Sequence, residues 1–345
     1  MSAKNLEFQL AERPETNIIP GRTFKLVETN KPTAADIKDG QVLVEVYYLS
    51  LDPAMRVNLQ DFRSYVPPVA IGERMRGYSL SKVLASKSSK ARVGDLVVAF
   101  TGWTEFAIVD EQYFQPGELP EGTKITDALG AAGLTGVTAY IGLERIGQPK
   151  RGETVVVSGA AGATGLVVGQ ICKIKGCRVV GIAGSDEKCE MLTRELGFDL
   201  ALNYKSPTFR DDFVRATPDF IDVFWDGVGG EILEMALDQA AEHARFVICG
   251  TISGYNNEGM QLAGVRNMYR ATLQRVRLEG FIITDHMREF PAAQQALSQW
   301  ICEGKIRRKE TIIRGGLEAA EHAVSHLFTG KNTGKLILEI KPYEG

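Results

Sequence analysis

The 345-residue sequence predicts an α/β protein, in which a doubly wound parallel sheet accompanies a second domain rich in β-strands. Three observations predict this fold class. A β-branched strand at Val155–Val157 leads into a glycine turn and then into apolar residues at helical spacing. Strand-like and helix-like segments alternate through the second half of the chain, as in parallel sheets with helical crossovers. The first 125 or so residues instead show short strand-like runs punctuated by glycine and proline.

The N-terminal part is expected to form a partly open barrel. Strands are predicted at 41–51, 78–85, 95–100 and 105–109. A helix is predicted at 129–143, where the short strand-like runs give way to alternating strand-like and helix-like segments.

The alternating part is expected to build the parallel sheet. Further strands are predicted at 178–183, 200–204, 221–226, 245–250 and 278–283, and helices at 185–196, 209–216 and 230–240. Near the C-terminus, a helix at 317–328 precedes a strand at 334–340, which we expect to rejoin the first domain.

The glycine turn after Val157 predicts a dinucleotide site. Gly159, Gly162 and Gly165 give the spacing G-x-x-G-x-x-G in place of the usual G-x-G-x-x-G. A strand, a glycine turn and a helix in succession place backbone N–H groups and a helix N-terminus where a pyrophosphate can bind.

The end of the next predicted strand favours NADPH over NADH. An acidic residue there would bind the ribose of NAD, whereas a 2′-phosphate needs cations and donors. The strand ends in small neutral residues, and Ser185 is suited to cap the following helix. Lys188 lies one turn later and can reach a phosphate, although a solvated helix face is the usual place for a lysine. Asp186 leaves the NAD alternative open.

Composition excludes several functions. The net charge of −3 argues against a broad nucleic-acid or membrane surface. The N-terminus lacks the apolar core of a signal peptide, and no stretch is long enough to span a bilayer. The five cysteines include no C-x-x-C pair, which indicates free thiols and a cytoplasmic location. Four arginines over a short stretch indicate a solvated or interface helix rather than a nucleic-acid contact: Arg266, Arg270, Arg275 and Arg277.

No metal site is expected. The first cysteine is Cys172 and the first histidine is His243, so the first half of the chain contains neither ligand type. His322 and His326 are four residues apart, but no third ligand is evident beside them, and two surface histidines are the simpler interpretation.

Short stretches spread along most of the chain resemble, in the same order, the sequences of one protein family. The sequence is similar to zinc-free medium-chain dehydrogenases/reductases, in the branch of prostaglandin reductases and plant double-bond reductases. The stretches that carry the resemblance are 51–56, 75–78, 133–140, 160–165, 184–188, 203–205, 249–256, 279–282 and 330–335.

The resemblance implies a fold, an activity and an assembly. It implies a GroES-like substrate domain at 1–128 and 306–345 and a Rossmann NADP-binding domain at 129–305. The implied activity is NADPH-dependent reduction of the C=C bond of α,β-unsaturated aldehydes and ketones. Relatives pair the edge strand expected at 278–283 across a two-fold axis, so a homodimer is expected.

The resemblance also implies the residues that bind the cofactor. Those expected at the pyrophosphate are Gly162, Ala163, Thr164 and Gly165, and those at the 2′-phosphate are Lys188 and Tyr204. Those expected around the nicotinamide are Cys249, Gly250, Thr251, Phe281, Ile283 and Asn332. Taken alone, Tyr204 would be an ordinary aromatic residue at a strand end, and Asn332 a turn residue.

Tyr255 is the candidate catalytic residue. Hydride addition to the β-carbon places negative charge on the carbonyl oxygen, and a donor at that oxygen stabilises the enolate. A phenol, with an ordinary pKa near ~10, remains protonated at neutral pH and can donate. The alternative is a loop tyrosine that packs on the cofactor without a catalytic role. The proton on the α-carbon would come from solvent.

Two positions depart from the family pattern. Relatives usually carry a tyrosine where this chain has Ala54, and often an asparagine where it has Gly227. Arg56, taken alone, would be a solvated surface charge. Two other functions stay open on these residues: an NADPH quinone oxidoreductase, and a protein that binds NADPH without turnover.

Overall fold

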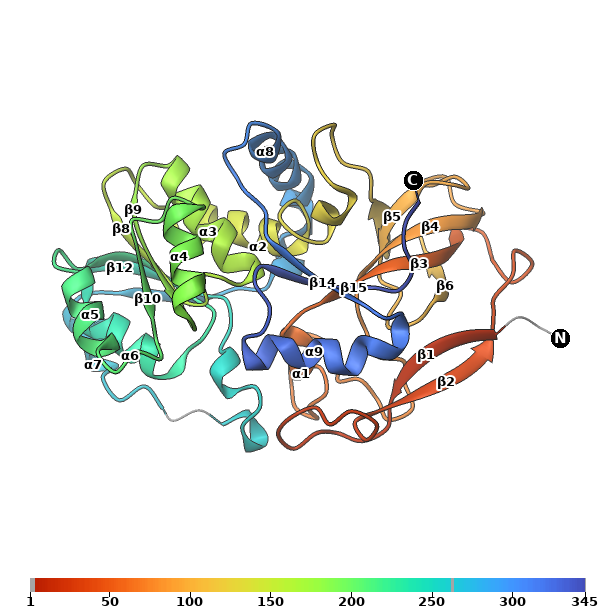
Figure 1. Ribbon diagram of the computed structural model, residues 1–345, viewed down its shortest axis with the longest axis horizontal. Coiled ribbons are helices and arrows are strands. Elements are labelled where there is room, and N and C mark those ends of the chain that lie inside the picture. The colour runs from red at the N-terminus through yellow and green to blue at the C-terminus, as the bar shows by residue number, and fades with distance from the viewer. Residues whose placement is uncertain (1–3, 262–263, 345) are drawn as a thin grey trace. The chain divides into compact units, whose positions relative to one another are not determined.

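A six-stranded parallel sheet forms the centre of residues 130–309 in the computed structural model (Figure 1). Its order is β10–β9–β8–β11–β12–β13, so the six strands, taken along the chain, stand in the order 3-2-1-4-5-6 that is typical of dinucleotide-binding folds. This arrangement confirms the predicted doubly wound parallel sheet. The strands are β8 (Thr154–Val157), β9 (Arg178–Ala183), β10 (Leu200–Asn203), β11 (Ile221–Asp226), β12 (Ala240–Ile248) and β13 (Arg277–Gly280).

The structure describes residues 4–261 and 264–344. The chain divides into two units, which we name the barrel unit (residues 4–129 and 310–344) and the Rossmann unit (the described residues of 130–309). Among the described residues, no helix has the length and apolar character needed to cross a bilayer.

Several helices of the Rossmann unit contact strands of the sheet. Val155, Val156 and Val157 of β8 are fully buried, as expected for a strand covered on both faces. A Cβ atom at Gly169 would lie 1.9 Å from Cζ of Phe198, so glycine is what lets the third helix close on its neighbours. The helices are α2 (Leu134–Gly142), α3 (Ala163–Ile174), α4 (Asp186–Arg194), α5 (Phe209–Ala216), α6 (Gly230–Asp238), α7 (Tyr269–Leu273) and α8 (Phe290–Cys302).

Several predicted boundaries in this unit are wrong. The helix expected at 129–143 begins only at Leu134 and ends in a wider turn, η2 (Leu143–Gly147). The helix expected at 230–240 stops at Asp238, because β12 begins at Ala240. The strand expected at 278–283 ends at Gly280, because the chain then forms the 3₁₀ turns of η5 (Ile283–Glu289).

The barrel unit contains a seven-stranded sheet of order β14–β15–β3–β4–β5–β7, and β6 pairs with β3 outside this path. The C-terminal strand β15 lies antiparallel to β3, with Leu338 opposite Leu49, so the tail joins the first domain as predicted. The strands are β3 (Gln41–Leu51), β4 (Ser79–Ser86), β5 (Leu96–Ala99), β6 (Phe106–Asp110), β7 (Phe114–Pro116), β14 (Glu310–Arg314) and β15 (Lys335–Glu339). The helices are α1 (Ala54–Val57) and α9 (Ala320–Thr329), the latter drawn in blue in Figure 1.

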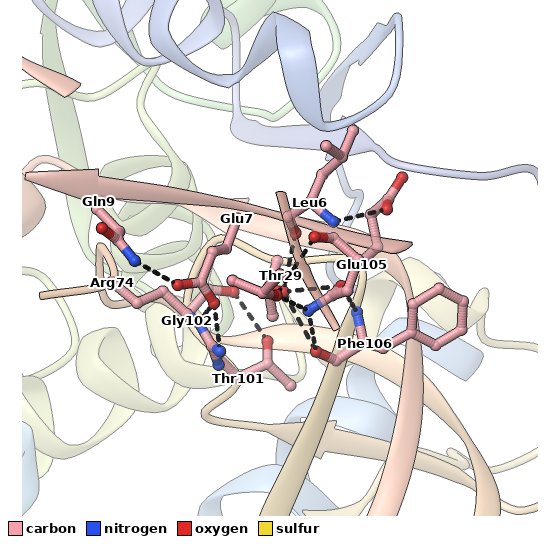
Figure 2. A network of polar contacts seen from close by, with 11 residues as sticks. Leu6, Glu7, Gln9, Thr29, Arg74, Thr101, Gly102, Glu105 and Phe106 are labelled. Carbon is pink, nitrogen blue, oxygen red and sulfur yellow. Dashed lines mark hydrogen bonds and ion pairs between the residues drawn. The ribbon is translucent and has the colours of Figure 1, made fainter. Parts of the chain in front are cut away.

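An N-terminal ribbon of two strands, β1 (Lys4–Leu10) and β2 (Phe24–Asn30), attaches to the barrel through buried polar contacts. Figure 2 shows the carboxylate of Glu7 between Gln9, whose amide donates at 2.7 Å, and the guanidinium of Arg74. In the same view, Glu105 accepts a hydrogen bond from the backbone N–H of Leu6 at 3.0 Å. These contacts pair groups that would be costly to bury alone, and thereby fix the ribbon on the barrel.

Candidate functional site

Most of the predicted site residues follow strands of the parallel sheet. Because the six strands run in one direction, their carboxyl ends lie along one edge, which is where doubly wound folds bind ligands. The glycine loop follows β8, Lys188 and Tyr204 follow β9 and β10, and Tyr255 follows β12. Asn332 belongs to the barrel unit and precedes β15.

The glycine loop has the backbone shape that its glycines allow. Gly159 adopts φ of +63°, a left-handed conformation that favours glycine. A Cβ atom at Gly165 would lie 2.4 Å from the carbonyl oxygen of Gly159, so no side chain fits between helix and loop. Gly162 is the N-cap of α3, and no side chain caps this helix start, which Ala163 and Thr164 continue. Uncapped N–H groups at the start of a helix suit an anionic ligand.

Two lysines and a tyrosine gather after β9 and β10. The ring of Tyr204 lies against the backbone of Gly184, where a Cβ atom would come within 2.9 Å of Cε1. The hydroxyl of Ser185 caps α4 by accepting a hydrogen bond from the N–H of Lys188 at 3.3 Å. Burial, followed by repulsion from Lys205, lowers the pKa of Lys188. The ammonium of Lys205 also lies 5.7 Å from the Tyr204 ring centroid.

Lys188 and Lys205 carry like charges that repel one another, and a multiply charged anion such as a 2′-phosphate would relieve this repulsion by binding between them. Asp186, the acidic residue that could bind an NAD ribose, already forms another hydrogen bond. Asn203 donates from its side-chain amide to Oδ1 of Asp186 at 2.8 Å. Asp186 also lies in the first turn of α4, where a negative charge stabilises the helix. This part of the site therefore fits NADP better than NAD.

Tyr255 lies in a loop that follows β12 and the short turn η3 (Ile252–Gly254). Its side chain folds back along the loop, and the phenolic oxygen accepts a hydrogen bond from the N–H of Thr251 at 3.3 Å. A Cβ atom at Gly250 would lie 3.0 Å from the same oxygen. Because a hydroxyl that accepts a hydrogen bond can still donate its proton, this half-buried phenol has the chemistry of an oxyanion donor.

The other residues expected at the nicotinamide have different surroundings. Burial, and then the charge of Asp226, raises the pKa of the Cys249 thiol to about 12, so the thiol stays protonated and unreactive. The ring of Phe281 packs edge-on against Trp225 at 6.1 Å between centroids. Ile283 begins η5, in place of the strand that was expected there.

Two expected positions can be compared with the family pattern. Ala54 is exposed at the start of α1, so this position has room for a larger side chain. The nearest atom to a Cβ at Gly227 would be 3.8 Å away, so a side chain would fit there too. Asn332 forms a local turn contact, donating from its side-chain amide to the carbonyl of Gly334 at 3.1 Å.

The expectation that Arg56 is a solvated surface charge is wrong. Its side chain is fully buried, and Nε donates to the carbonyl of Thr16 at 3.0 Å. One terminal nitrogen donates to Thr16 at 2.7 Å and to the carbonyl of Pro14 at 3.1 Å. Burial lowers the pKa of Arg56 to about 10. The guanidinium thus joins α1 to the loop at 14–16, and its role is structural.

The histidines and arginines considered above have ordinary surroundings. His322 and His326 both lie on α9, and the described residues contain no group of three potential ligands that could hold a metal ion. Each of the four clustered arginines pairs with a carboxylate: Arg266 with Glu234, Arg270 with Asp238, Arg275 with Glu242 and Arg277 with Glu279.

Two polar residues at this edge of the sheet were missed by the sequence reasoning. Lys205 directly follows Tyr204 in a stretch that matches the family, so its position beside a predicted phosphate contact was a usable signal. Asp226 ends β11 and is fully buried, and its carboxylate bonds to groups on the loops around it. A strand-end aspartate gives no sign of such contacts in the sequence alone.

Comparison with known proteins assigns the family. Residues 7–116 match a family model described as the N-terminal domain of oxidoreductases, and residues 163–299 match one described as zinc-binding dehydrogenases. The NADPH-dependent curcumin reductase of Escherichia coli is 39% identical, over 98% of this chain and 97% of the relative. Prostaglandin reductase 1 of Rattus norvegicus is 41% identical, over 92% of this chain and 93% of the relative.

The structural match is equally extensive. The crystal structure of CurA from Vibrio vulnificus in complex with NADPH has a TM-score of 0.91 and 36% identity, covering 98% of this chain and all of that one (100%). The chain therefore belongs to the medium-chain dehydrogenase/reductase family of oxidoreductases. Among the residues that the structure describes, no three potential ligands are grouped so that they could hold the zinc named in one matched family's description.

Proposed function

We propose that this oxidoreductase uses NADPH to reduce the C=C bond of α,β-unsaturated aldehydes and ketones. Its use of NADP follows from the relatives whose names state that dependence, and the two lysines after β9 and β10 suit the cofactor's phosphate. The relatives named for curcumin, prostaglandin and 2-alkenal reduction support an enone or enal as substrate. The observation that carries the proposal is the phenol of Tyr255 at the ligand-binding edge of the sheet.

The cofactor-binding residues are proposed from their positions. The backbone of Gly162, Ala163, Thr164 and Gly165 would receive the pyrophosphate at the start of α3. Lys188 and Tyr204 would hold the 2′-phosphate, together with Lys205, whose charge acts on Lys188. Backbone or side-chain groups near the nicotinamide would come from Cys249, Gly250, Thr251, Phe281, Ile283 and Asn332.

The bound cofactor supplies a hydride to the β-carbon of the substrate. The work left to the chain is to hold the substrate and to stabilise the charge that develops on the carbonyl oxygen. The hydroxyl of Tyr255 would donate to that oxygen, and its contact with the N–H of Thr251 keeps the phenol oriented. The thiol of Cys249, with its pKa raised to about 12, is unsuited to act as a base or nucleophile here. Solvent would supply the proton to the α-carbon.

The test follows NADPH oxidation with a panel of enals, enones and quinones, with wild type and Tyr255→Phe side by side. We expect turnover of enones and a drop in kcat of about a hundredfold in the variant, as for loss of one oxyanion donor. Tyr269→Phe is the matched control, because Tyr269 is exposed on α7 of the same unit. Turnover of quinones alone, with Tyr255→Phe unaffected, would contradict the proposal. NADPH binding without any oxidation would favour a non-catalytic role.

A homodimer is the assembly we propose, paired through β13. This strand is last in the sheet order, and Leu278 on it is 38% exposed. An exposed sheet edge is a ready template for pairing with a second chain. We also propose a cytoplasmic location, which suits the free thiols of Cys172, Cys177, Cys189, Cys249 and Cys302.

A further inference from the structure

Asp226 is a buried acidic residue at the ligand-binding edge to which no function has been assigned above. It ends β11, and its side chain is fully buried. One carboxylate oxygen, Oδ1, accepts three hydrogen bonds: from the hydroxyl of Ser158 at 2.8 Å, from the N–H of Val228 at 3.0 Å and from the N–H of Gly229 at 2.9 Å. A carboxylate that gathers three donors fixes the loop in which two of them lie.

The contacts of Asp226 lead first to the glycine loop. Ser158 immediately precedes Gly159, and its hydroxyl also accepts a hydrogen bond from the N–H of Gly227 at 2.9 Å. One serine hydroxyl therefore joins the end of β8 to the end of β11. Asp226 is thus hydrogen-bonded to the residue that directly precedes the loop proposed to hold the pyrophosphate.

The contacts lead second to the loop of Tyr255. The backbone carbonyl of Asp226 accepts a hydrogen bond from the N–H of Cys249 at 2.8 Å. The carbonyl of Gly227 accepts from the N–H of Ile252 at 3.2 Å. The carbonyl of Val228 accepts from the N–H of Ser253, also at 3.2 Å. The loop that Asp226 fixes is thus the support for the turn on which Tyr255 stands.

The two carboxylate oxygens of Asp226 have different surroundings, since within the described part of the chain only Oδ1 accepts hydrogen bonds. Oδ2 is buried and has no hydrogen-bond partner among the described residues. Burial raises the pKa of Asp226, while the bonds from Gly229, Val228 and Ser158 act in the opposite direction. Burying a carboxylate with one oxygen unpaired costs free energy. Because Asp226 is nevertheless buried, with Oδ1 accepting three hydrogen bonds, it is expected to have a role beyond packing.

We propose that Asp226 is a positioning residue for the reduction, which holds the loop at 227–229 and through it the Tyr255 turn. This inference rests on the proposed function, because it assigns Tyr255 the catalytic contact. It predicts that the effect of Asp226 on kcat depends on the phenol of Tyr255. A residue needed only for folding would affect the enzyme whether or not that phenol was present.

The experiment is a double-mutant cycle of Asp226→Ala and Tyr255→Phe, with kcat for an enone and the Kd for NADPH measured separately. We expect Asp226→Ala to lower kcat by about tenfold with Tyr255 present, and by at most about twofold in the Tyr255→Phe background. Asp226→Asn, which keeps an acceptor oxygen, should recover most of the lost kcat. Asp222→Asn is the matched control, since Asp222 joins the other end of β11 to β8 by accepting from the N–H of Thr154 at 2.8 Å.

Ser158→Ala keeps the test decisive if Asp226→Ala does not fold, because it removes only the bridging hydroxyl. It should lower kcat in the same direction and show the same dependence on Tyr255. Equal fold losses in both Tyr255 backgrounds, or a raised Kd for NADPH with kcat unchanged, would overturn the inference. If Tyr255→Phe by itself leaves kcat unchanged, the proposed function fails instead, and the two failures are distinguishable.

Discussion

The ring of Tyr204 lies so close to the backbone of Gly184 that a Cβ atom on Gly184 would come within 2.9 Å of Cε1 and 3.2 Å of the phenolic oxygen. Glycine is therefore required at position 184, where β9 has just ended, if the tyrosine ring is to keep its place against this backbone. Through the role proposed for Tyr204 at the 2′-phosphate, this relationship would connect a backbone position to the selection of the cofactor.

We predict that Gly184→Ala weakens NADPH binding by roughly tenfold and changes NADH binding little, because only the 2′-phosphate site is displaced. The measurement is the Kd of each cofactor by fluorescence titration. Gly264→Ala is the control, since a Cβ atom there would meet no atom within 4 Å apart from its chain neighbours. Equal weakening for both cofactors would contradict a specific effect on the phosphate site.

The pair Lys188 and Lys205 predicts a pH dependence of cofactor binding. The pKa of Lys188 is lowered by burial and then by Lys205, and a bound phosphate would raise it again. Binding then favours the protonated lysine, so NADPH affinity is constant near neutral pH and falls as the pH rises through the lowered pKa. NADH, which lacks the phosphate, should show no such alkaline loss.

Lys205→Met should weaken NADPH binding by about tenfold and shift the alkaline loss of affinity to higher pH, since the repulsion on Lys188 is removed. Lys150→Met serves as control, because Lys150 is exposed before the amino end of β8. A Kd for NADPH that is unchanged in Lys205→Met would exclude Lys205 from the phosphate site.

Arg56 should matter for stability rather than catalysis. Arg56→Ala removes the hydrogen bonds to the carbonyls of Thr16 and Pro14 and leaves a cavity in place of a fully buried side chain, so we expect the free energy of unfolding to fall by about 3 kcal/mol. Arg56→Lys should fall in between, because one ammonium cannot reproduce the planar fork. Urea unfolding measures both, with Arg63→Ala, on an exposed residue of the same unit, expected within about 0.5 kcal/mol of wild type. A loss of kcat at unchanged stability would contradict this role.

The predicted bounds agree best with the structure for elements whose apolar residues follow a single helical or strand periodicity. The strand at 178–183, the helix at 209–216 and the strand at 221–226 have the predicted bounds. The N-terminal ribbon and β14 were not predicted, because apolar residues on them pack with partners far along the chain. The helix α8 was not predicted either, and it packs against α2. The burial of Arg56 depends on a loop about 40 residues earlier in the chain, and no local pattern reports such a contact.

In the candidate site, too, features that are local in sequence could be predicted, whereas contacts between distant segments could not. The glycine loop could be predicted because its spacing, strand and helix are contiguous in sequence. The repulsion between Lys188 and Lys205 could not, because it requires β10 to lie beside β9. The contacts of Asp226 likewise depend on β8 pairing with β11, although 68 residues separate Ser158 from Asp226.

The edge strand β13 predicts the assembly. Wild type should sediment at twice the 37.8 kDa of one chain, and Leu278→Glu should shift it toward the single-chain mass by placing charge at the paired edge. Leu273→Glu is the control, since Leu273 is 56% exposed on α7. A wild-type protein that sediments as a single chain would contradict the proposed homodimer.

Hydride is proposed to reach the β-carbon of an enone, and isotope transfer tests this step most directly. The enzyme would be incubated with an enone and NADPH carrying deuterium at the transferred position, and the product analysed by mass spectrometry and NMR. We predict a saturated ketone with one deuterium on the β-carbon and an intact carbonyl group. An allylic alcohol with deuterium on the former carbonyl carbon, or no reduced enone while a quinone is reduced, would contradict it.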